Sequence, residues 1–308
     1  MARSIATMTA VIEAVGLRKR FGRVHALAGL DLRIREGEVH GFLGPNGAGK
    51  STTIRIIFGL LRKSGGEISV LGRDPWAEAV AVHRELSYVP GDVSLWPNLT
   101  GGEIIDLLTG MRGGVDTSLR TRLIEDFELD PRKKARSYSK GNRQKVALVA
   151  AFARRASLYV LDEPTSGLDP VMEGVFNAQV RRVTAEGATV LLSSHILSEV
   201  EQLCDRVTII RGGVAVEEGT LSELRHLTAN AYSVVTDAPE AELAALAGVS
   251  HLRRENDTVH FDVQTEAASR VLAMLSQHRV DAITITPPSL EELFLRHYGD
   301  QAPSTGAG

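Results

Sequence analysis

Between residues 11 and 219, the pattern of hydrophobic and polar positions defines two types of segment that alternate along the chain. Short continuous apolar runs, typical of strands buried on both faces, are separated by stretches with helical periodicity. Because helices between such strands cover both faces of a sheet, this alternation predicts a mostly parallel α/β sheet. The clearest strands are expected at residues 39–43, 158–161, 189–192 and 206–210.

Residues 84–156 have few strand patterns and many helical ones, which predicts a helical subdomain inserted into the α/β fold. After residue 219 the pattern changes to a short helix at 220–227. The elements that follow have the βαββαβ order of a small ferredoxin-like α+β domain, and a closing helix comes after them. They are expected at 231–235, 240–247, 250–254, 258–263, 266–277 and 280–286, with the closing helix at 289–297.

These patterns divide the chain into a first domain at 1–219, a C-terminal accessory or dimerisation domain at 220–298, and a tail at 299–308. The tail is small and polar, and we expect it to be disordered. With 43% hydrophobic and 24% charged residues among 308, the chain can bury a core. A net charge of -3 gives no electrostatic reason to expect a nucleic-acid partner.

No apolar run approaches the roughly 20 residues that a membrane-spanning helix needs. We therefore expect a protein that is soluble by itself and reaches a membrane only through a partner. Cys204 is the one cysteine, so it cannot form an internal disulfide, and a reducing compartment suits it. Its expected role is that of a small buried apolar residue.

Residues 44–51 read GPNGAGKS and form a complete G-x-x-x-x-G-K-S phosphate-binding motif between a predicted strand and a predicted helix. Glycines let the backbone curl so that several N–H groups point at one phosphate. Lys50 is expected to reach the β- and γ-phosphates, and the Ser51 hydroxyl to bind Mg²⁺. The predicted nucleotide-binding residues of this segment are Gly44, Pro45, Asn46, Gly47, Ala48, Gly49, Lys50, Ser51 and Thr52.

Two carboxylates, Asp162 and Glu163, directly follow the predicted strand at 158–161. We expect Asp162 to hold Mg²⁺ through water and Glu163 to activate the attacking water as general base. An apolar run that ends in Asp-Glu is often only a strand meeting a surface loop. The phosphate-binding motif upstream favours the catalytic interpretation.

Residues 138–144 read YSKGNRQ and precede another predicted helix. With the motifs on either side, this segment resembles the signature of the ABC (ATP-binding cassette) ATPase family, which usually reads LSGGQ. Ser139 and Gly141 keep that pattern, whereas Lys140 and Asn142 depart from it. The resemblance implies that Ser139, Gly141 and Asn142 serve the ATP bound by the opposite subunit, because a helix N-terminus attracts anions.

Three further positions match the family. Residues 164–169, PTSGLD, resemble the dimer-contacting D-loop and end in Asp169, which we assign to the nucleotide site. His195 resembles the switch histidine that hydrogen-bonds the γ-phosphate, so the resemblance gives Lys50, Glu163 and His195 as the catalytic set. Phe21 stands where the family stacks an aromatic ring on adenine, although an aromatic residue there could instead belong to the core.

Gly91 stands where the family has a glutamine that contacts Mg²⁺ and the lytic water. One hypothesis is that Asp92 partly replaces it as a metal-site residue, because a carboxylate suits a Mg²⁺ shell. The other is a looser loop with a solvated Asp92. Nearby, Trp96 and Leu99 could anchor the coupling helix of a membrane subunit, or they could equally be subdomain core.

The resemblance extends over about residues 11–219, and residues 288–294 are similar to the closing helix of bacterial drug- and antibiotic-export ATPases of the daunorubicin-resistance type. The resemblance to the ABC ATPase family implies an ATPase that uses ATP and Mg²⁺, pairs with itself or a related ATPase, and drives a separate integral-membrane permease. The similarity of residues 288–294 favours export as the direction of transport. The subunit would be cytoplasmic, held at the inner face of the membrane by that permease.

Two other classes of function fit the sequence less well. A soluble ABC ATPase that acts on ribosomes or DNA is disfavoured, because the chain has one cassette, no heptad run and an acidic balance. A binding module without hydrolysis is disfavoured by Glu163 and His195. The transported cargo is not indicated, since its contacts would lie in the permease.

Overall fold

The computed structural model describes residues 9–194, 196–226 and 229–286. The chain forms two compact units that meet in sequence between Glu218 and Gly219. His195, the helix expected at 289–297 and the tail expected at 299–308 lie outside the described residues.

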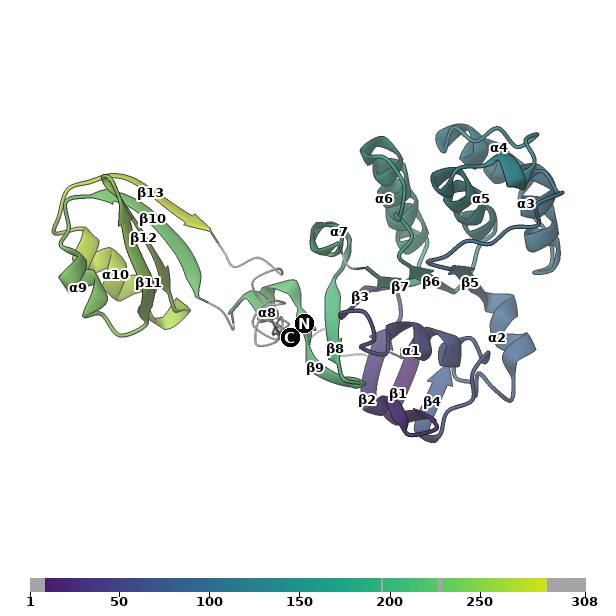
Figure 1. Cartoon of the computed structure of the whole chain (residues 1–308), viewed down its shortest axis with the longest axis horizontal. Helices are drawn as coiled ribbons and strands as arrows, with labels where there is room; N and C mark the ends of the chain where they lie inside the picture. The colour runs from purple at the N-terminus through teal and green to yellow at the C-terminus, as the bar shows by residue number, and fades with distance from the viewer. Residues whose placement is uncertain (1–8, 195, 227–228, 287–308) are drawn as a thin grey trace, which may run out of the picture. The chain divides into compact units, whose positions relative to one another are not determined.

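A six-stranded sheet is the centre of the first unit, in the order β5-β6-β7-β3-β8-β9 (Figure 1). The pairs from β5 to β8 are parallel, so the prediction of a mostly parallel sheet is confirmed. The pattern did not single out β5, a four-residue edge strand at the start of the helical segment. The strands are β3 (Val39–Leu43), β5 (Leu86–Val89), β6 (Leu158–Asp162), β7 (Thr189–Ser193), β8 (Arg206–Arg211) and β9 (Val214–Thr220).

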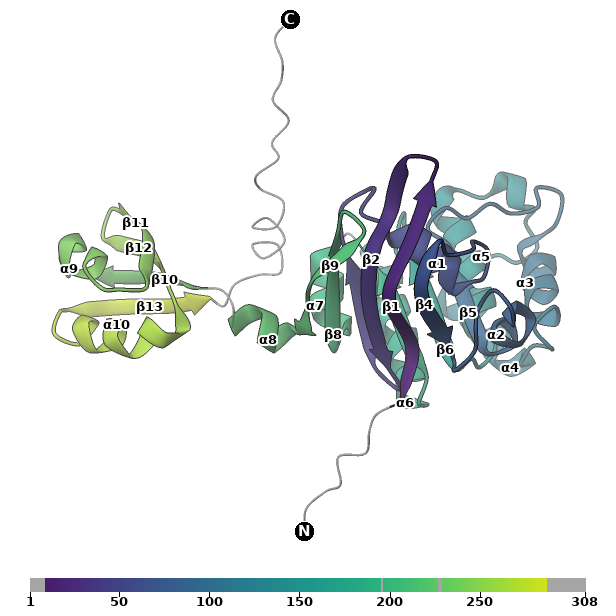
Figure 2. The same ribbon diagram turned by 90° about the horizontal axis from the view of Figure 1, so that it is seen from below.

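Both faces of this sheet are covered. Helices α5 (Lys140–Phe152), α6 (Pro170–Ala185) and α7 (Leu197–Leu203) lie on one face, and α1 (Lys50–Ile57) lies on the other (Figure 1). Beyond α1 is an antiparallel sheet in the order β2-β1-β4 (Figure 2). Two-sided cover buries β3 and β7 along their whole length. The strands of the antiparallel sheet are β1 (Ala10–Phe21), β2 (Val24–Arg35) and β4 (Gly65–Val70).

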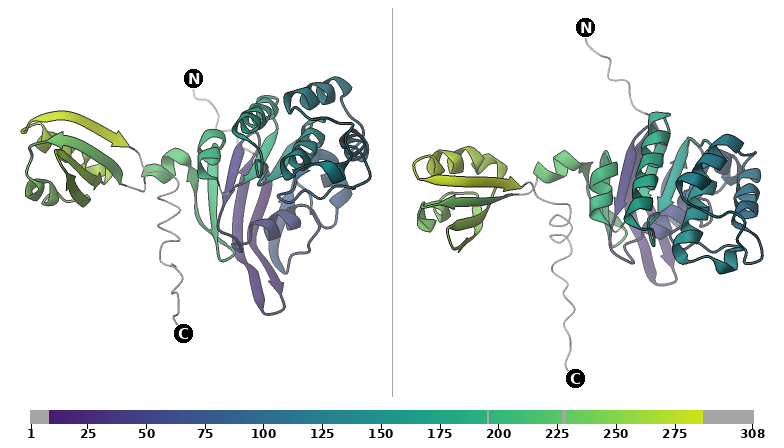
Figure 3. Two further views of the ribbon diagram at one scale, coloured as in Figure 1. Left: turned by 45° about the horizontal axis from the view of Figure 1, so that its top comes forward. Right: turned by 90° about the horizontal axis from the view of Figure 1, so that it is seen from above.

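A group of helices extends from the β5 side of the sheet, drawn in blue to teal in Figure 3. It contains α3, α4, a short 3-10 turn and α5, while α2 precedes β5. Thr100 begins α3 with a capping box, because its hydroxyl accepts the Glu103 N–H at 3.2 Å and its own N–H donates to Glu103 Oε2 at 2.7 Å. The bounds are α2 (Ala79–Glu85), α3 (Gly101–Gly110), α4 (Thr117–Asp126) and the turn Ala135–Ser137.

In the second unit, a helix is followed by a four-stranded antiparallel sheet in the order β11-β12-β10-β13. This is the split βαββαβ arrangement, so the ferredoxin-like prediction is confirmed. Alternate residues of β10 and β12 are buried, and the rings of Tyr232 and Phe261 stack with centroids 5.5 Å apart. The elements are α8 (Leu221–His226), β10 (Asn230–Thr236), α9 (Glu240–Ala244), β11 (Val249–Glu255), β12 (Thr258–Val263), the 3-10 turn Thr265–Ala267, α10 (Ala268–Leu275) and β13 (Val280–Thr286).

Cys204 directly follows α7 and is buried against β3, which confirms its predicted role. A Cβ built on Gly41 would lie 3.1 Å from its sulfur, so the strand and the helix pack closely here. Burial raises the pKa of the Cys204 thiol well above its ordinary value, with help from the nearby carboxylates Glu199 and Asp205. Within the part of the chain that the structure describes, every helix is too short or too polar to cross a bilayer.

Candidate nucleotide site

The phosphate-binding motif forms the turn between β3 and α1, as its sequence predicts. Gly49 adopts a φ of 116°, in the left-handed region that favours glycine, and it caps α1. A Cβ on Gly49 would also lie 2.9 Å from the Ala26 carbonyl oxygen. Helix α1 therefore begins at Lys50, and the free N–H groups of its first turn border the loop.

Lys50 is only 6% exposed, and its ammonium donates hydrogen bonds to the carbonyl oxygens of Gly44 and Pro45, the second at 3.2 Å. Burial lowers the pKa of Lys50, while the carboxylates of Glu163 and Asp162 oppose this by favouring the charged form. The structure thus brings the predicted phosphate-binding lysine near Asp162, the predicted metal residue, and Glu163, the predicted general base, which come more than a hundred residues later in the chain.

Asp162 is the last residue of β6, directly opposite Ser193 on the parallel strand β7. Burial raises the pKa of Asp162, and the Glu163 carboxylate adds to this, whereas the Ser193 hydroxyl and the Lys50 ammonium lower it. Mg²⁺ prefers hard oxygen ligands, and both predicted metal residues supply them, as the partly buried carboxylate of Asp162 and the hydroxyl of Ser51 in the first turn of α1. The donor set therefore fits the predicted metal.

Glu163 leaves the strand in the left-handed region, with a φ of 47°. Its N–H donates to the Ser193 carbonyl oxygen at 2.8 Å, which ties the turn to β7. A non-glycine residue in this region costs about 1–3 kcal/mol, and such strain clusters at functional sites. The turn redirects the chain immediately after Asp162, the predicted metal-site residue.

The signature segment caps α5, because the Ser139 hydroxyl accepts the Asn142 N–H at 3.2 Å. Three contacts then join α5 to residues 164–168 of the same chain. Lys140 Nζ donates to Ser166 Oγ at 2.7 Å, and the buried Gln144 Nε2 donates to the Pro164 carbonyl oxygen at 2.8 Å. At the third contact, a Cβ on Gly141 would clash with the Gly167 carbonyl oxygen.

Sequence reasoning missed these contacts of Lys140 and Gln144 with the D-loop. The one signal that could have found them was that both segments were already assigned to the nucleotide site from the sequence. Ser139, Gly141 and Asn142 as residues that serve an opposite subunit's ATP remain predictions.

Gly91 lies against the end of β6, since a Cβ at this position would be 3.3 Å from the Asp162 carbonyl oxygen and 3.6 Å from Glu163 Cβ. The position where the family has a glutamine is therefore next to both carboxylate residues. Asp92, the neighbouring residue, is exposed. Its role at the metal remains a prediction.

Phe21 ends β1 and is 49% exposed, so the alternative of a core aromatic residue is wrong. Its ring stays accessible, with Lys19 Nζ 5.0 Å from the centroid. Asp169 caps α6, and its Oδ1 accepts the N–H groups of Val171 and Met172 at 3.0 Å each. That role is structural, and the assignment of Asp169 to the nucleotide site remains a prediction.

An apolar groove of about 360 Å³ lies beside β5 and α3. Trp96 is 49% exposed on its wall, so Trp96 is not subdomain core, and Met111 beside it is 77% exposed. Leu99 is more enclosed, and its carbonyl oxygen accepts the Ala135 N–H at 2.8 Å. The groove is lined by Phe58, His83, Tyr88, Leu95, Trp96 and Met111, among others.

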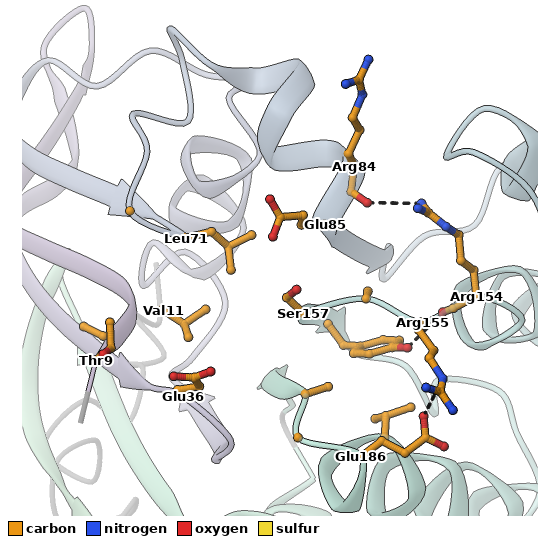
Figure 4. Close-up of a pocket in the computed structure, with 17 residues that line it drawn as sticks. Thr9, Val11, Glu36, Leu71, Arg84, Glu85, Arg154, Arg155, Ser157 and Glu186 are labelled. Atoms are coloured by element: carbon orange, nitrogen blue, oxygen red, sulfur yellow. Dashed lines mark hydrogen bonds and ion pairs between the residues drawn. The ribbon is translucent and has the colours of Figure 1, made fainter. Parts of the chain in front are cut away.

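A larger cavity of about 640 Å³ lies at the amino-terminal ends of β5 and β6 in the same sheet (Figure 4). Its lining includes Glu85 and Ser157, which directly precede β5 and β6, whereas the candidate site follows the carboxyl ends of the strands. Arg155 Nε is 3.4 Å from Glu186 Oε2, and Arg154 Nη1 donates to the Arg84 carbonyl oxygen at 3.2 Å. These arginines already have partners, so we assign no ligand here.

Two family models match the chain. The "ABC transporter" model matches residues 27–166, and the "ATP-binding protein DrrA1-3-like, C-terminal domain" model matches residues 219–298. The solved structure of an ATP-binding subunit of an ABC transporter is similar, with a TM-score of 0.66 and 32% identity over 70% of this chain and 92% of that one. A dimeric ATP-binding cassette bound to ADP and Pi shares the fold, with a TM-score of 0.61 at 24% identity, over 68% of this chain and 98% of that one.

Curated relatives match nearly the whole chain. The daunorubicin resistance ATP-binding protein DrrA3 of Streptomyces coeruleorubidus is 35% identical over 92% of this chain and 95% of its own. The daunorubicin/doxorubicin resistance protein DrrA of Streptomyces peucetius is 36% identical over 96% and 94%. The linearmycin resistance protein LnrL of Bacillus subtilis is 30% identical over 94% and 98%. The chain therefore belongs to the ABC ATPase family, as an ATP-hydrolysing subunit of the transporter type.

Proposed function

We propose that this ATPase powers an exporter, with a separate integral-membrane permease that carries the cargo across the bilayer. The convergence of Lys50, Asp162 and Glu163 at one edge of the sheet is the observation that carries the proposal, because it joins phosphate binding to water activation. Export is supported by relatives that are named for resistance to daunorubicin, doxorubicin and linearmycin. The match of residues 219–298 to a C-terminal domain of the same group supports it too.

Within the site, each residue has a distinct task. Lys50 leaves the carbonyl oxygens of Gly44 and Pro45 and binds the β- and γ-phosphates at the N-terminus of α1. Ser51 and Asp162 would hold Mg²⁺, which would supply neutralising charge at the phosphates. Glu163 accepts a proton from the attacking water. His195, outside the described residues, completes the set as the partner of the γ-phosphate.

Two subunits, identical or closely related, close head to tail around two ATP molecules. The N-terminus of α5, with Ser139, Gly141 and Asn142, then faces the ATP held by the partner. Phe21, exposed at the end of β1, stacks on adenine. Hydrolysis weakens the contact across the γ-phosphate and lets the pair reopen.

The apolar groove beside β5 and α3 receives a short helix of the permease. Trp96 and Met111 supply exposed apolar surface, which anchors the centres of such interfaces, while Leu99 supports the loop from within. The groove begins at Pro90, next to Gly91, and Gly91 lies against Asp162 and Glu163. A displacement of the permease helix in the groove can therefore be transmitted to the two carboxylate residues. This arrangement holds the subunit at the cytoplasmic face of the membrane through its partner.

Purified wild type and Glu163→Gln test the proposal together. Wild type should hydrolyse Mg²⁺-ATP, and the variant should lose at least about a hundredfold in rate, the scale of general-base catalysis. The variant should also form a stable dimer in ATP on size-exclusion chromatography. Glu125→Gln, an exposed position on α4, is the matched control and should keep full activity. Wild-type activity that survives Glu163→Gln would exclude the assigned mechanism.

A further inference from the structure

Lys140 is the first residue of α5, and its ammonium is fixed to a neighbouring segment of its own chain. Nζ donates to Ser166 Oγ at 2.7 Å, and the Ser166 N–H donates to the Glu163 carbonyl oxygen at 3.2 Å. One side chain therefore links the signature segment to the turn that carries the general base. The usual family glycine at this position could not make such a contact.

The charge of Lys140 is only weakly satisfied in this arrangement. The first turn of a helix is the positive end of its dipole, so a cation there is in an unfavourable position. The Ser166 hydroxyl is a neutral acceptor and does not offset that charge. Within residues 9–194, Lys140 is exposed and forms no ion pair with a carboxylate. The ammonium is thus positioned to exchange its partner for an anion.

The proposed dimer, on which this inference rests, brings such an anion to the N-terminus of α5. Hydrogen bonds between an ammonium and a phosphate are roughly twice as strong as those between neutral groups. The Lys140 side chain is exposed and carries its compact ammonium group on a flexible stem. It can therefore rotate away from Ser166 without any change in the backbone of α5.

We propose that Lys140 leaves Ser166 and binds the γ-phosphate of the partner's ATP when the dimer closes. The exchange releases the Ser166 side chain beside Glu163 of the same subunit. Each Lys140 then senses nucleotide in one site and loosens the turn that holds the general base of the other site. Lys140 is a phosphate-binding residue in this scheme, and Ser166 is its competing partner.

If Ser166 and the γ-phosphate compete for Lys140, substitutions of Lys140 and Ser166 should have opposite effects on the stability of the ATP-bound dimer. In a Glu163→Gln background, which keeps ATP intact, Lys140→Ala should weaken the Mg²⁺-ATP dimer about tenfold or more, since a charge-assisted bond is lost. Ser166→Ala should tighten the dimer about twofold to fivefold, since Lys140 no longer has to break a hydrogen bond. The double variant Lys140→Ala/Ser166→Ala should match Lys140→Ala alone.

The measurement is the dimer dissociation constant by sedimentation velocity in saturating Mg²⁺-ATP. Lys145→Ala removes the same charge one turn later on α5 and should change that constant less than twofold. Far-UV circular dichroism and ATP binding to the dilute monomer check the fold, and both should be unchanged because the phosphate loop of the same chain is untouched.

Each result decides between explanations. If Ser166→Ala weakens the dimer as Lys140→Ala does, the contact is a fixed brace and the exchange is wrong. A Lys140→Ala dimer as tight as its parent also overturns the inference while leaving the proposed function intact. A parent Glu163→Gln chain that does not dimerise in ATP refutes the composite site itself, and the exchange falls with it.

Discussion

Asp162 pairs in register with Ser193 across the parallel strands β6 and β7, and the Ser193 carbonyl oxygen also accepts the Glu163 N–H at 2.8 Å. The backbone of Ser193 thus holds the turn at Glu163, while its buried hydroxyl, which has no hydrogen-bond partner among the described residues, belongs to the residue in register with Asp162. Burial raises the pKa of Asp162, and the nearby Ser193 side chain partly opposes this rise.

Ser193→Ala should therefore weaken binding of Mg²⁺ and leave the turn at Glu163 in place. Without the hydroxyl, the ionised form of Asp162 loses support, and the Mg²⁺ concentration for half-maximal ATPase should rise about tenfold or more, the scale typical of outer-shell partners of a metal. Ser157→Ala, just before the same strand β6 at its other end, is the control. An unchanged Mg²⁺ titration would show that Ser193 does not support the metal residue.

Glu38 should stabilise the fold only above acidic pH. Burial by itself raises the pKa of this carboxyl, but hydrogen bonds from His40 and the Arg35 N–H outweigh it and leave the pKa below 4.5. A depressed pKa means that the carboxylate stabilises the native state above the unfolded pKa and loses that contribution as pH falls through the folded one.

Glu38→Gln should accordingly lower the free energy of unfolding by about 1–3 kcal/mol at pH 7, because the buried His40 loses a charged partner. The gap between the variant and wild type should narrow below pH 4.5. Urea denaturation at several pH values measures this. Glu36→Gln, exposed two residues upstream, should show no such trend. A gap that stays constant with pH would mean that the charge of Glu38 is irrelevant.

Asp92→Ala asks whether this residue compensates for Gly91. If a carboxylate near the metal substitutes for the missing glutamine, turnover of Mg²⁺-ATP should fall about tenfold or more. The same change should have little effect in a Gly91→Gln background, where the amide returns. Equal turnover of Asp92→Ala and wild type would leave Asp92 as a solvated surface residue.

Gly141→Ala should disrupt the contact between α5 and the D-loop. The added Cβ would clash with the Gly167 carbonyl oxygen, which belongs to the backbone and must shift. Overpacking of this kind costs about 1–3 kcal/mol of stability. Gly174→Ala, inside α6 with open space around it, should be neutral or gain up to about 1 kcal/mol from helix propensity. Thermal melts of both variants compare the sites, and equal melting temperatures would contradict the expected clash.

Sequence and structure agree best where the signal is local. The turn at Gly49 and Lys50 could be predicted because glycine spacing, the preceding strand and the following helix lie close together in the chain. Strands β3 and β6 could be predicted because burial on both faces requires continuous apolar residues.

Agreement ends where separate segments meet. The contacts of Lys140 with Ser166 and of Gln144 with Pro164 depend on how closely α5 approaches the turn after β6. The periodicity of apolar residues along the chain carries no information about the distance between these two segments. The left-handed φ of Glu163 likewise occurs beside a backbone hydrogen bond to β7, a contact with a distant segment. Exposure of Phe21 and Trp96 could not be read from residue type, since aromatic side chains suit cores and binding surfaces alike.

The burial of Cys204 against Gly41 makes the chain convenient for labelling. Because its one native thiol is enclosed and remains protonated, maleimide reagents should react with it only after α7 separates from β3. Wild type then reports local opening of that helix through its labelling rate. Cysteines introduced at exposed positions could carry fluorophores for distance measurements without first removing the natural one.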